Sequence, residues 1–290
     1  MSIEDQHLAV LAVQGGEVVH ESYAEGVTAD TTLISWSMAK SMTQALVGFA
    51  VDDGKLDLHG PAPVPEWADD ERSAITVDQL LRMCSGLRWC EDYVDDRVSD
   101  VIEMLFGEAR ADMAGFAAGF PLEHEPGTVF NYSSGTTNIL ARIVGDLDDV
   151  EALLRDRLFG PLGMTSAEPK FDDVGTFVGS SYVYATARDF ARFGQLYLDG
   201  GRDILPTEWV DYARTESPVP VEPGEQPYGA HWWLFPDVPG SFAAQGYEGQ
   251  RTLVVPDLDL VVVRLGKTPA ELKPDLDAWL VALVDDLRRG

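Results

Sequence analysis

The sequence predicts an α+β fold in which one antiparallel β-sheet is built from both ends of the chain and flanked by helices. A block of helices is inserted between the two parts of the sheet. Short apolar or alternating runs occur near the N-terminus and again after Tyr228, whereas the intervening residues follow helical spacing. Strands at the two ends must bury their faces, and pairing in a common sheet achieves this.

The N-terminal elements follow from simple patterns. Residues 7–13 and 17–23 are apolar or alternating runs separated by a Gln-Gly-Gly turn, which predicts a β-hairpin. Apolar residues then recur every three or four positions over residues 37–52, which predicts a largely buried helix. Gly54 is expected to cap the C-terminal end of this helix.

The remaining elements alternate less regularly. Thr76 and Gln79 have the spacing of a capping box that opens a helix reaching Met83. Further helices are predicted over residues 99–106, 111–119, 134–145, 148–158, 186–199 and 207–213. Strands are predicted over residues 228–235, 241–247, 251–256 and 258–266, followed by a closing helix over residues 271–289.

The charge of the chain limits its partners. Twenty-one Lys and Arg oppose 49 Asp and Glu, a formal net charge of −28. Nucleic acids and anionic membranes would be repelled and are not expected as partners. The N-terminal residues lack the positive and apolar regions of a secretory signal, so a cytoplasmic location is expected. Cys84 and Cys90 have neither zinc nor redox spacing, which favours two free thiols.

Ser37 and Lys40 form the only S-x-x-K sequence in the chain. Ser37 is predicted at a helix start, where unsatisfied N–H groups favour negative charge, and Lys40 lies one turn later on the same face. Burial and the helix dipole should lower the pKa of Lys40, so that a neutral amine can accept the serine proton. The alternative is a capping serine followed by a solvated lysine.

Two further segments carry residues suited to a site. Tyr132 follows a Glu-Pro-Gly turn and precedes a predicted helix, and a tyrosine beside an ammonium is expected to ionise more readily and to act as a general acid or base. Its alternative role is a buried core aromatic. Gly246 and Gly249 lie at the junction of two predicted strands, where glycine permits a ligand or another backbone to approach closely, or forms an ordinary bulge.

Taken in order, S-x-x-K, then Y-S-S after P-G-x-x-F, then G-x-x-G-Q resemble the three motifs of the penicillin-recognising serine hydrolases. Within that superfamily the chain resembles the class C β-lactamase-like branch, particularly 6-aminohexanoate-dimer hydrolases and related carboxylesterases. The resemblance includes the segments LLRMCSGLRW, EDYVDD and YATARDFARFGQLYLDGG. It implies a single domain over residues 1–290, with an α/β part at about 1–60 and 180–290 and a helical part at about 61–179.

The resemblance also implies a role for individual residues. Ser37 would be the nucleophile, Lys40 its activating partner, and Tyr132 the group that shuttles a proton to the leaving group. The backbone N–H groups of Ser37 and Gln250 would form the oxyanion hole. An acyl-enzyme on Ser37 would be hydrolysed by water activated near Tyr132. The residues expected to contact the substrate are Tyr93, Ser134, Tyr247, Glu248 and Gly249.

The chain departs from the β-lactamases of this branch at two motifs. They carry Y-x-N and a lysine in the third motif, whereas this chain has Ser134 and the sequence Tyr-Glu-Gly over residues 247–249. Penicillin turnover is therefore not expected as the main activity. The charge of Glu248 is expected to disfavour anionic substrates and to suit neutral esters or a substrate bearing an amine.

The sequence thus predicts a cofactor-free serine hydrolase that acts on a small-molecule ester or amide. No metal is implied, because the five His residues are scattered without ligand spacing. Two alternatives stay open. The first is a D-Ala-D-Ala-type peptidase or weak β-lactamase, and the second is a catalytically inactive ligand-binding relative. The sequence leaves the oligomeric state open.

Overall fold

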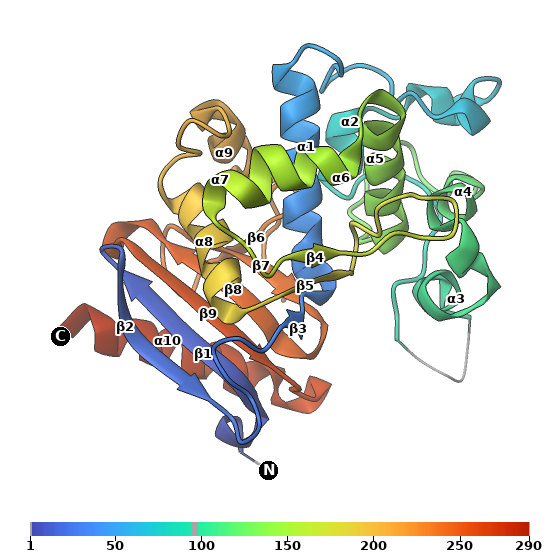
Figure 1. Cartoon of the computed structure of the whole chain (residues 1–290). Coiled ribbons are helices and arrows are strands. Elements are labelled where there is room, and N and C mark those ends of the chain that lie inside the picture. Colours follow the sequence, from blue (N-terminus) through green and yellow to red (C-terminus); the bar gives the residue numbers. More distant parts are fainter. Residues whose placement is uncertain (1, 94–97, 290) are drawn as a thin grey trace.

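The computed structural model describes residues 2–93 and 98–289 of the chain. Within this part, the main sheet has six strands in the order β2-β1-β9-β8-β7-β6, and every neighbouring pair is antiparallel (Figure 1). The strands are β1 (His7–Gln14), β2 (Glu17–Tyr23), β6 (Trp233–Phe235), β7 (Ser241–Gly246), β8 (Gln250–Val255) and β9 (Leu260–Gly266). Because β1 pairs with β9, the prediction of a sheet assembled from both ends of the chain is confirmed.

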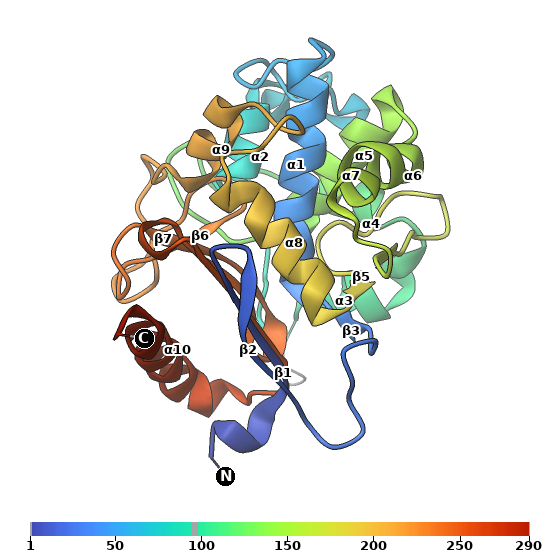
Figure 2. The same ribbon diagram turned by 60° about the vertical axis from the view of Figure 1, so that its left-hand side comes forward.

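Helices cover both faces of this sheet (Figure 2). Helix α8 (Ala187–Leu198) packs on β1, β8 and β9 from one side. Helix α10 (Lys273–Arg289) covers the opposite face, where its buried Leu276, Leu280 and Val284 join an apolar cluster with residues of β8 and β9. The sheet is therefore buried on both faces, because α8 and α10 each turn an apolar side towards it.

The helical block is built around α1 (Ala39–Asp52), whose residues are buried from Ala39 to Ala50. A Cβ at Gly48 would lie 2.3 Å from the Trp209 indole nitrogen, so glycine is what allows α9 (Thr207–Arg214) to pack closely against α1. The other helices of the block and its surroundings are α2 (Val77–Leu81), α3 (Asp100–Phe106), α4 (Met113–Ala118), α5 (Ser134–Leu147), α6 (Val150–Ala152), α7 (Gly160–Leu162) and α9 (Thr207–Arg214). Residues Leu153–Phe159 between α6 and α7 form a π-helix.

Most predicted elements are confirmed with shifted ends. The N-terminal hairpin and the capping box of Thr76 and Gln79 are present, and both cysteines are free. The helix predicted from residue 37 begins as a 3₁₀ turn, Trp36–Met38, and becomes α-helical at residue 39. A second, small sheet was not predicted, because its strands have only two or three residues each: β3 (Leu33–Ile34), β4 (Glu168–Pro169) and β5 (Val183–Ala185).

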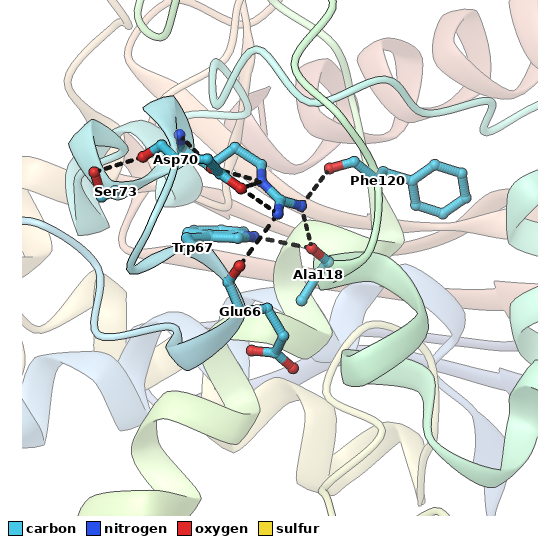
Figure 3. Close-up of polar contacts among 7 residues, drawn as sticks. Glu66, Trp67, Asp70, Ser73, Ala118 and Phe120 are labelled. Carbon is cyan, nitrogen blue, oxygen red and sulfur yellow. Dashed lines mark hydrogen bonds and ion pairs between the residues drawn. The ribbon is translucent and has the colours of Figure 1, made fainter.

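A hydrogen-bonded cluster fixes the segment before α2 to the end of α4 (Figure 3). Arg72 donates from Nη1 to the carbonyls of Ala118 at 2.8 Å and Phe120 at 2.9 Å, and the Trp67 indole donates to the Ala118 carbonyl at 2.9 Å. Asp70 holds the same guanidinium through an ion pair. The guanidinium thereby satisfies carbonyls at the C-terminal end of a helix, where no intrahelical donors remain.

Candidate active site

Ser37 lies in the 3₁₀ turn that connects β3 to α1, directly after a strained residue. Trp36 has a φ of 44°, in the left-handed region that is costly for a bulky side chain. Its ring is held edge-on against Tyr247, with ring centroids 5.7 Å apart. Backbone strain of this kind persists only where surrounding packing enforces it, and it is common next to reacting groups.

The end of β7 packs directly on this turn. A Cβ at Gly246 would lie 2.4 Å from the Ser35 carbonyl oxygen and 3.1 Å from the Trp36 Cβ. Only glycine allows the sheet to approach the Ser37 turn this closely. The expectation that a glycine here marks the close approach of another backbone is confirmed.

Lys40 is buried beside Ser37, with 1% of its surface exposed. Its Nζ lies 3.0 Å from Ser37 Oγ, 2.8 Å from Ser134 Oγ and 3.1 Å from the Ser180 carbonyl oxygen. Burial lowers the pKa of Lys40 to about 8, and the nearby charge of Glu91 opposes this decrease. The lysine is thus not a solvated side chain, and the expected decrease in its pKa is confirmed.

Tyr132 lies over the same lysine, with Lys40 Nζ 4.9 Å from its ring centroid. Its ring packs against Trp233 and Tyr228. Burial and the charge of Glu91 raise the pKa of Tyr132 well above its ordinary value, while hydrogen bonding to Ser37 opposes the increase. The expectation that Tyr132 ionises readily is therefore wrong, because burial, the largest of these influences, favours the neutral phenol. The phenol stays protonated at neutral pH.

Glu91 is a site residue that the sequence analysis missed. Its Oε2 accepts hydrogen bonds from the Trp89 indole at 2.6 Å and the Ser134 backbone N–H at 2.8 Å. Its Oε1 accepts the Ser134 hydroxyl at 2.5 Å. Since Ser134 Oγ also accepts from Lys40, a continuous chain links the amine to the carboxylate. The position of Glu91, two residues before the predicted substrate residue Tyr93, was the signal in the sequence that could have identified it as a site residue. Residues 94–96 of the EDYVDD segment lie outside the described part.

Ser37 opens onto a cavity of about 540 Å³ that is also lined by Glu91 and Tyr132. Four predicted substrate residues line it too: Tyr93, Tyr247, Glu248 and Gly249. The rings of Tyr93 and Tyr247 are stacked with centroids 4.6 Å apart, which gives the cavity an aromatic wall. Ser134 is the exception. It is fully buried between Lys40 and Glu91, so it supports the site from behind and does not face the cavity.

The structure contradicts the assignment of Gln250 to the oxyanion hole. Its backbone N–H donates to the Tyr247 carbonyl within the turn that joins β7 to β8. Its side-chain amide donates to the carbonyls of Tyr247 at 2.9 Å and Gly266 at 2.7 Å, and the residue is 2% exposed. The backbone N–H of Gln250 is therefore occupied within the turn between β7 and β8. It is not free to bind the substrate oxygen, as the resemblance implies. Tyr247, at the start of this turn, lines the cavity instead.

No group of three or more His, Cys, Asp or Glu side chains suited to a metal ion occurs within residues 2–93 and 98–289. The same residues contain no helix that is long and apolar enough to cross a membrane.

The fold and this arrangement of serine, lysine and tyrosine around a cavity are those expected of penicillin-recognising hydrolases. A sequence model of the beta-lactamase family matches residues 5–286, and the chain belongs to that family. The chain is 30% identical to the 6-aminohexanoate-dimer hydrolase of Paenarthrobacter ureafaciens, across 93% of this chain and 74% of that protein. It is also 30% identical to penicillin-binding protein 4 of Amycolatopsis lactamdurans, across 63% of this chain and 55% of that protein.

Solved structures show the same fold at lower identity. A Bacillus anthracis protein, provisionally named as a 6-aminohexanoate-dimer hydrolase, superposes with a TM-score of 0.84 at 22% identity, covering 98% of this chain and 81% of that one. The octameric penicillin-binding protein homologue from Pyrococcus abyssi superposes with a TM-score of 0.77 at 18% identity, covering 95% and 72%. The protein is thus a beta-lactamase-family hydrolase similar to 6-aminohexanoate-dimer hydrolase.

Proposed function

We propose that the protein is a cofactor-free serine hydrolase that cleaves a small ester or amide through an acyl-enzyme on Ser37. The observation that supports this proposal most directly is the buried Lys40 Nζ, 3.0 Å from Ser37 Oγ, with its pKa lowered to about 8. The hydrogen-bond partners of this amine are two hydroxyls and a carbonyl, all of them neutral. A lysine held this way gives up its proton at a moderate pH and can act as a base.

Acylation would then begin with transfer of the Ser37 hydroxyl proton to neutral Lys40 as Oγ attacks the substrate carbonyl carbon. The oxyanion would be held by the backbone N–H groups of Ser37 and Tyr247. Each of these belongs to the first part of a single helical turn, where N–H groups have no intrahelical acceptor. Tyr132, which is protonated, would donate its proton to the departing oxygen or nitrogen. The Lys40 ammonium would then return a proton to the Tyr132 phenolate.

Deacylation would use the same groups in reverse. Water entering from the cavity beside Tyr132 attacks the ester carbonyl and gives up its proton to the base formed by Tyr132 and Lys40. The C–O bond to Ser37 then breaks, Oγ recovers a proton, and the acid is released. No group outside the protein and water is needed for either half-reaction.

The proposed substrate class follows from the cavity and from the relatives. The name of the Paenarthrobacter relative describes the hydrolysis of a 6-aminohexanoate dimer. A β-lactam is a less suitable substrate here, because Ser134 is buried behind Lys40 and a glutamate occupies the third motif. We therefore propose a small, non-β-lactam ester or amide as the substrate.

Replacing Ser37 with alanine is expected to lower hydrolysis of a p-nitrophenyl ester by at least about 10³-fold and to abolish labelling by a fluorophosphonate. Both would be measured on purified protein, with the exposed Ser22→Ala as the matched control. Equal turnover and labelling in Ser37→Ala and the parent would refute the proposal. Tight binding of one ligand, with no turnover across an ester and amide panel, would instead favour an inactive binding relative.

Replacing Glu91 with glutamine is expected to shift the acidic limb of the pH–kcat/KM profile to lower pH. The charge of Glu91 raises the pKa of Lys40, so its removal leaves the amine neutral at lower pH. Activity below pH 8 should therefore increase relative to activity at high pH. Glutamine keeps the length of the side chain and can still accept hydrogen bonds from Ser134 and Trp89. An unchanged acidic limb would show that Glu91 does not act on Lys40.

A further inference from the structure

His231 is a buried histidine that the proposed mechanism does not use. It is 2% exposed and lies just before β6. Its backbone has a φ of 57°, in the left-handed region that is costly for a residue with a large side chain. A strained backbone that carries a buried polar ring persists only where the contacts of that residue compensate for both.

The hydrogen bonds of the ring define its protonation state. Nδ1 lies 2.8 Å from the Leu81 carbonyl oxygen, and Nε2 lies 3.0 Å from Thr137 Oγ1. The carbonyl oxygen can only accept, so Nδ1 carries the proton, and the Thr137 hydroxyl donates to Nε2 of a neutral ring. Burial lowers the pKa of His231 to about 3, against the hydrogen bond to Leu81 and with the charge of Lys40. The ring is therefore neutral, with one tautomer, at ordinary pH.

These contacts join three helices at one residue. Thr137 belongs to α5, and Leu81 is the last residue of α2. The backbone carbonyl of His231 accepts a hydrogen bond from Ser41 Oγ of α1 at 2.8 Å. Its backbone N–H also donates to the Leu81 carbonyl at 3.1 Å. His231 thus contacts α1, α2 and α5 through hydrogen bonds.

Two of these helices carry the proposed base and its support. Ser41 directly follows Lys40 in α1. Thr137 lies one turn after Ser134 in α5, and Lys40 donates to Ser134 Oγ at 2.8 Å. The bridge from Ser41 through His231 to Thr137 therefore runs beside the contact between Lys40 and Ser134 and holds the same two helices together.

The contact with α2 leads to Tyr132. After Leu81 the chain reaches Met83, whose carbonyl accepts the backbone N–H of Asn131 at 2.7 Å, and Asn131 directly precedes Tyr132. On the other side, Trp233 follows two residues after His231 and packs on the Tyr132 ring, with centroids 5.3 Å apart. The position of Tyr132 over Lys40 is thus linked to His231 by two routes.

We propose that His231 is a positioning residue of the hydrolase, whose neutral ring fixes α1, α2 and α5 at the spacing that sets Tyr132 over Lys40 and excludes water from the amine. This inference rests on the proposed hydrolase function. Lys40 is 1% exposed, and the charge that acts on it is that of Glu91. Separation of the helices would let water reach the amine and would favour its charged form.

Thr137→Val keeps the shape of the side chain but removes the hydroxyl, which leaves Nε2 of His231 buried and unpaired. It is expected to lower kcat for a p-nitrophenyl ester by about tenfold and to leave KM within about twofold, because reacting groups are misplaced while the cavity lining is kept. The acidic limb of the pH–kcat/KM profile should move up by about one pH unit, since water that reaches Lys40 raises its pKa. Thr137→Ser restores the hydroxyl and should reverse both effects.

His231→Asn tests the same contact from the other side. Asparagine tolerates a left-handed backbone and keeps a donor near the Leu81 carbonyl, but it is too short to reach Thr137. It should reproduce the losses of Thr137→Val. The double variant His231→Asn/Thr137→Val should lose no more than about twofold beyond either single variant, and losses that multiply would overturn the shared contact.

Val284→Ala is the matched control for a general loss of stability. Val284 is fully buried in the separate apolar cluster beneath α10, which contains no residue of α1, α2 or α5, and its truncation leaves a cavity there. The acidic limb should stay at its position in the parent. An equal shift in Val284→Ala, or an unshifted limb in both Thr137→Val and His231→Asn, would overturn the positioning role.

Two further measurements do not depend on turnover. Nitrogen-15 NMR of the parent should show a neutral His231 ring with an unprotonated Nε2, and a charged ring or a proton on Nε2 would overturn the proposal. In denaturant unfolding, the rise in stability caused by titration of Lys40 should begin at higher pH in Thr137→Val than in the parent. If the parent hydrolyses no ester or amide while both of these results hold, the hydrolase function fails and the positioning of Lys40 stands.

Discussion

Replacing Lys40 with methionine is expected to lower kcat/KM by about 10²- to 10⁴-fold at every pH, because the base that takes the Ser37 proton is removed. Methionine is similar in length and fits an apolar environment, so the fold should be retained. The hydroxyls of Ser37 and Ser134 and the Ser180 carbonyl would lose their shared donor. The measurement is ester hydrolysis together with circular dichroism to confirm the fold.

The same variant is expected to change how stability depends on pH. The pKa of Lys40 is about 8 in the folded protein, below the value of about 10.4 in an unfolded chain. Between these values the unfolded chain holds a proton that the folded protein lacks, so the free energy of unfolding of the parent rises with pH. The gain is about 3 kcal/mol across this window, and Lys40→Met should lack it.

Denaturant unfolding of both proteins at pH 7, 9 and 10.5 would measure this difference. Lys55→Met, a change to a half-exposed lysine at the other end of α1, serves as the control and should keep the rise in stability. If the parent and Lys40→Met show the same pH dependence, the buried amine does not titrate as argued. If Lys40→Met retains kcat/KM within tenfold of the parent, Lys40 is not the base.

Replacing Tyr132 with phenylalanine is expected to have the second largest effect, and the size of that effect should depend on the leaving group. The ring would still pack against Trp233 and Tyr228, whereas the proton donor is lost. Alkyl esters and amides need a proton on the departing atom, so their kcat/KM should fall by about 10²- to 10³-fold. A p-nitrophenyl ester should lose less than about tenfold, because nitrophenolate departs without protonation.

The measurement is kcat/KM across esters whose leaving groups differ in pKa, in the parent and in Tyr132→Phe. The slope against leaving-group pKa should be steeper in the variant. Tyr228→Phe is the matched control, since Tyr228 is buried in the same aromatic cluster but does not line the cavity. An equal loss for all leaving groups would mean that Tyr132 only positions other residues.

Local patterns predicted the fold and the reacting pair well. The spacing of Ser37 and Lys40 on one helix, and the apolar run that buries this helix, are properties of a short segment, so the contact between the two side chains could be predicted without knowing the rest of the fold. The hairpin and the late strands were predictable for the same reason. The close approach of another backbone at Gly246 was also predictable, because a glycine within a strand usually marks either such an approach or a bulge.

The errors arose where distant segments meet or where burial decides. Glu91 reaches Lys40 only through Ser134, a contact across 43 residues. The sign of the pKa shift of Tyr132 depends on how deeply the ring is buried, which a loop-to-helix junction does not reveal. The error at Gln250 depends on the geometry of one turn, because a shift of one or two residues decides which N–H faces the cavity.

The pairing of β1 with β9 has a consequence for how the molecule folds. His7 pairs with Gly266, so the central ladder of the sheet closes a loop of more than 250 residues. Contacts this distant in sequence cannot form until most of the chain has been synthesised, and they slow folding. Until β9 arrives, one edge of the N-terminal hairpin is unpaired and is free to pair with other chains. The close packing of Gly246 on Ser35 also has to wait for these C-terminal strands. Ser37 is therefore synthesised long before the strands that complete the active site around it.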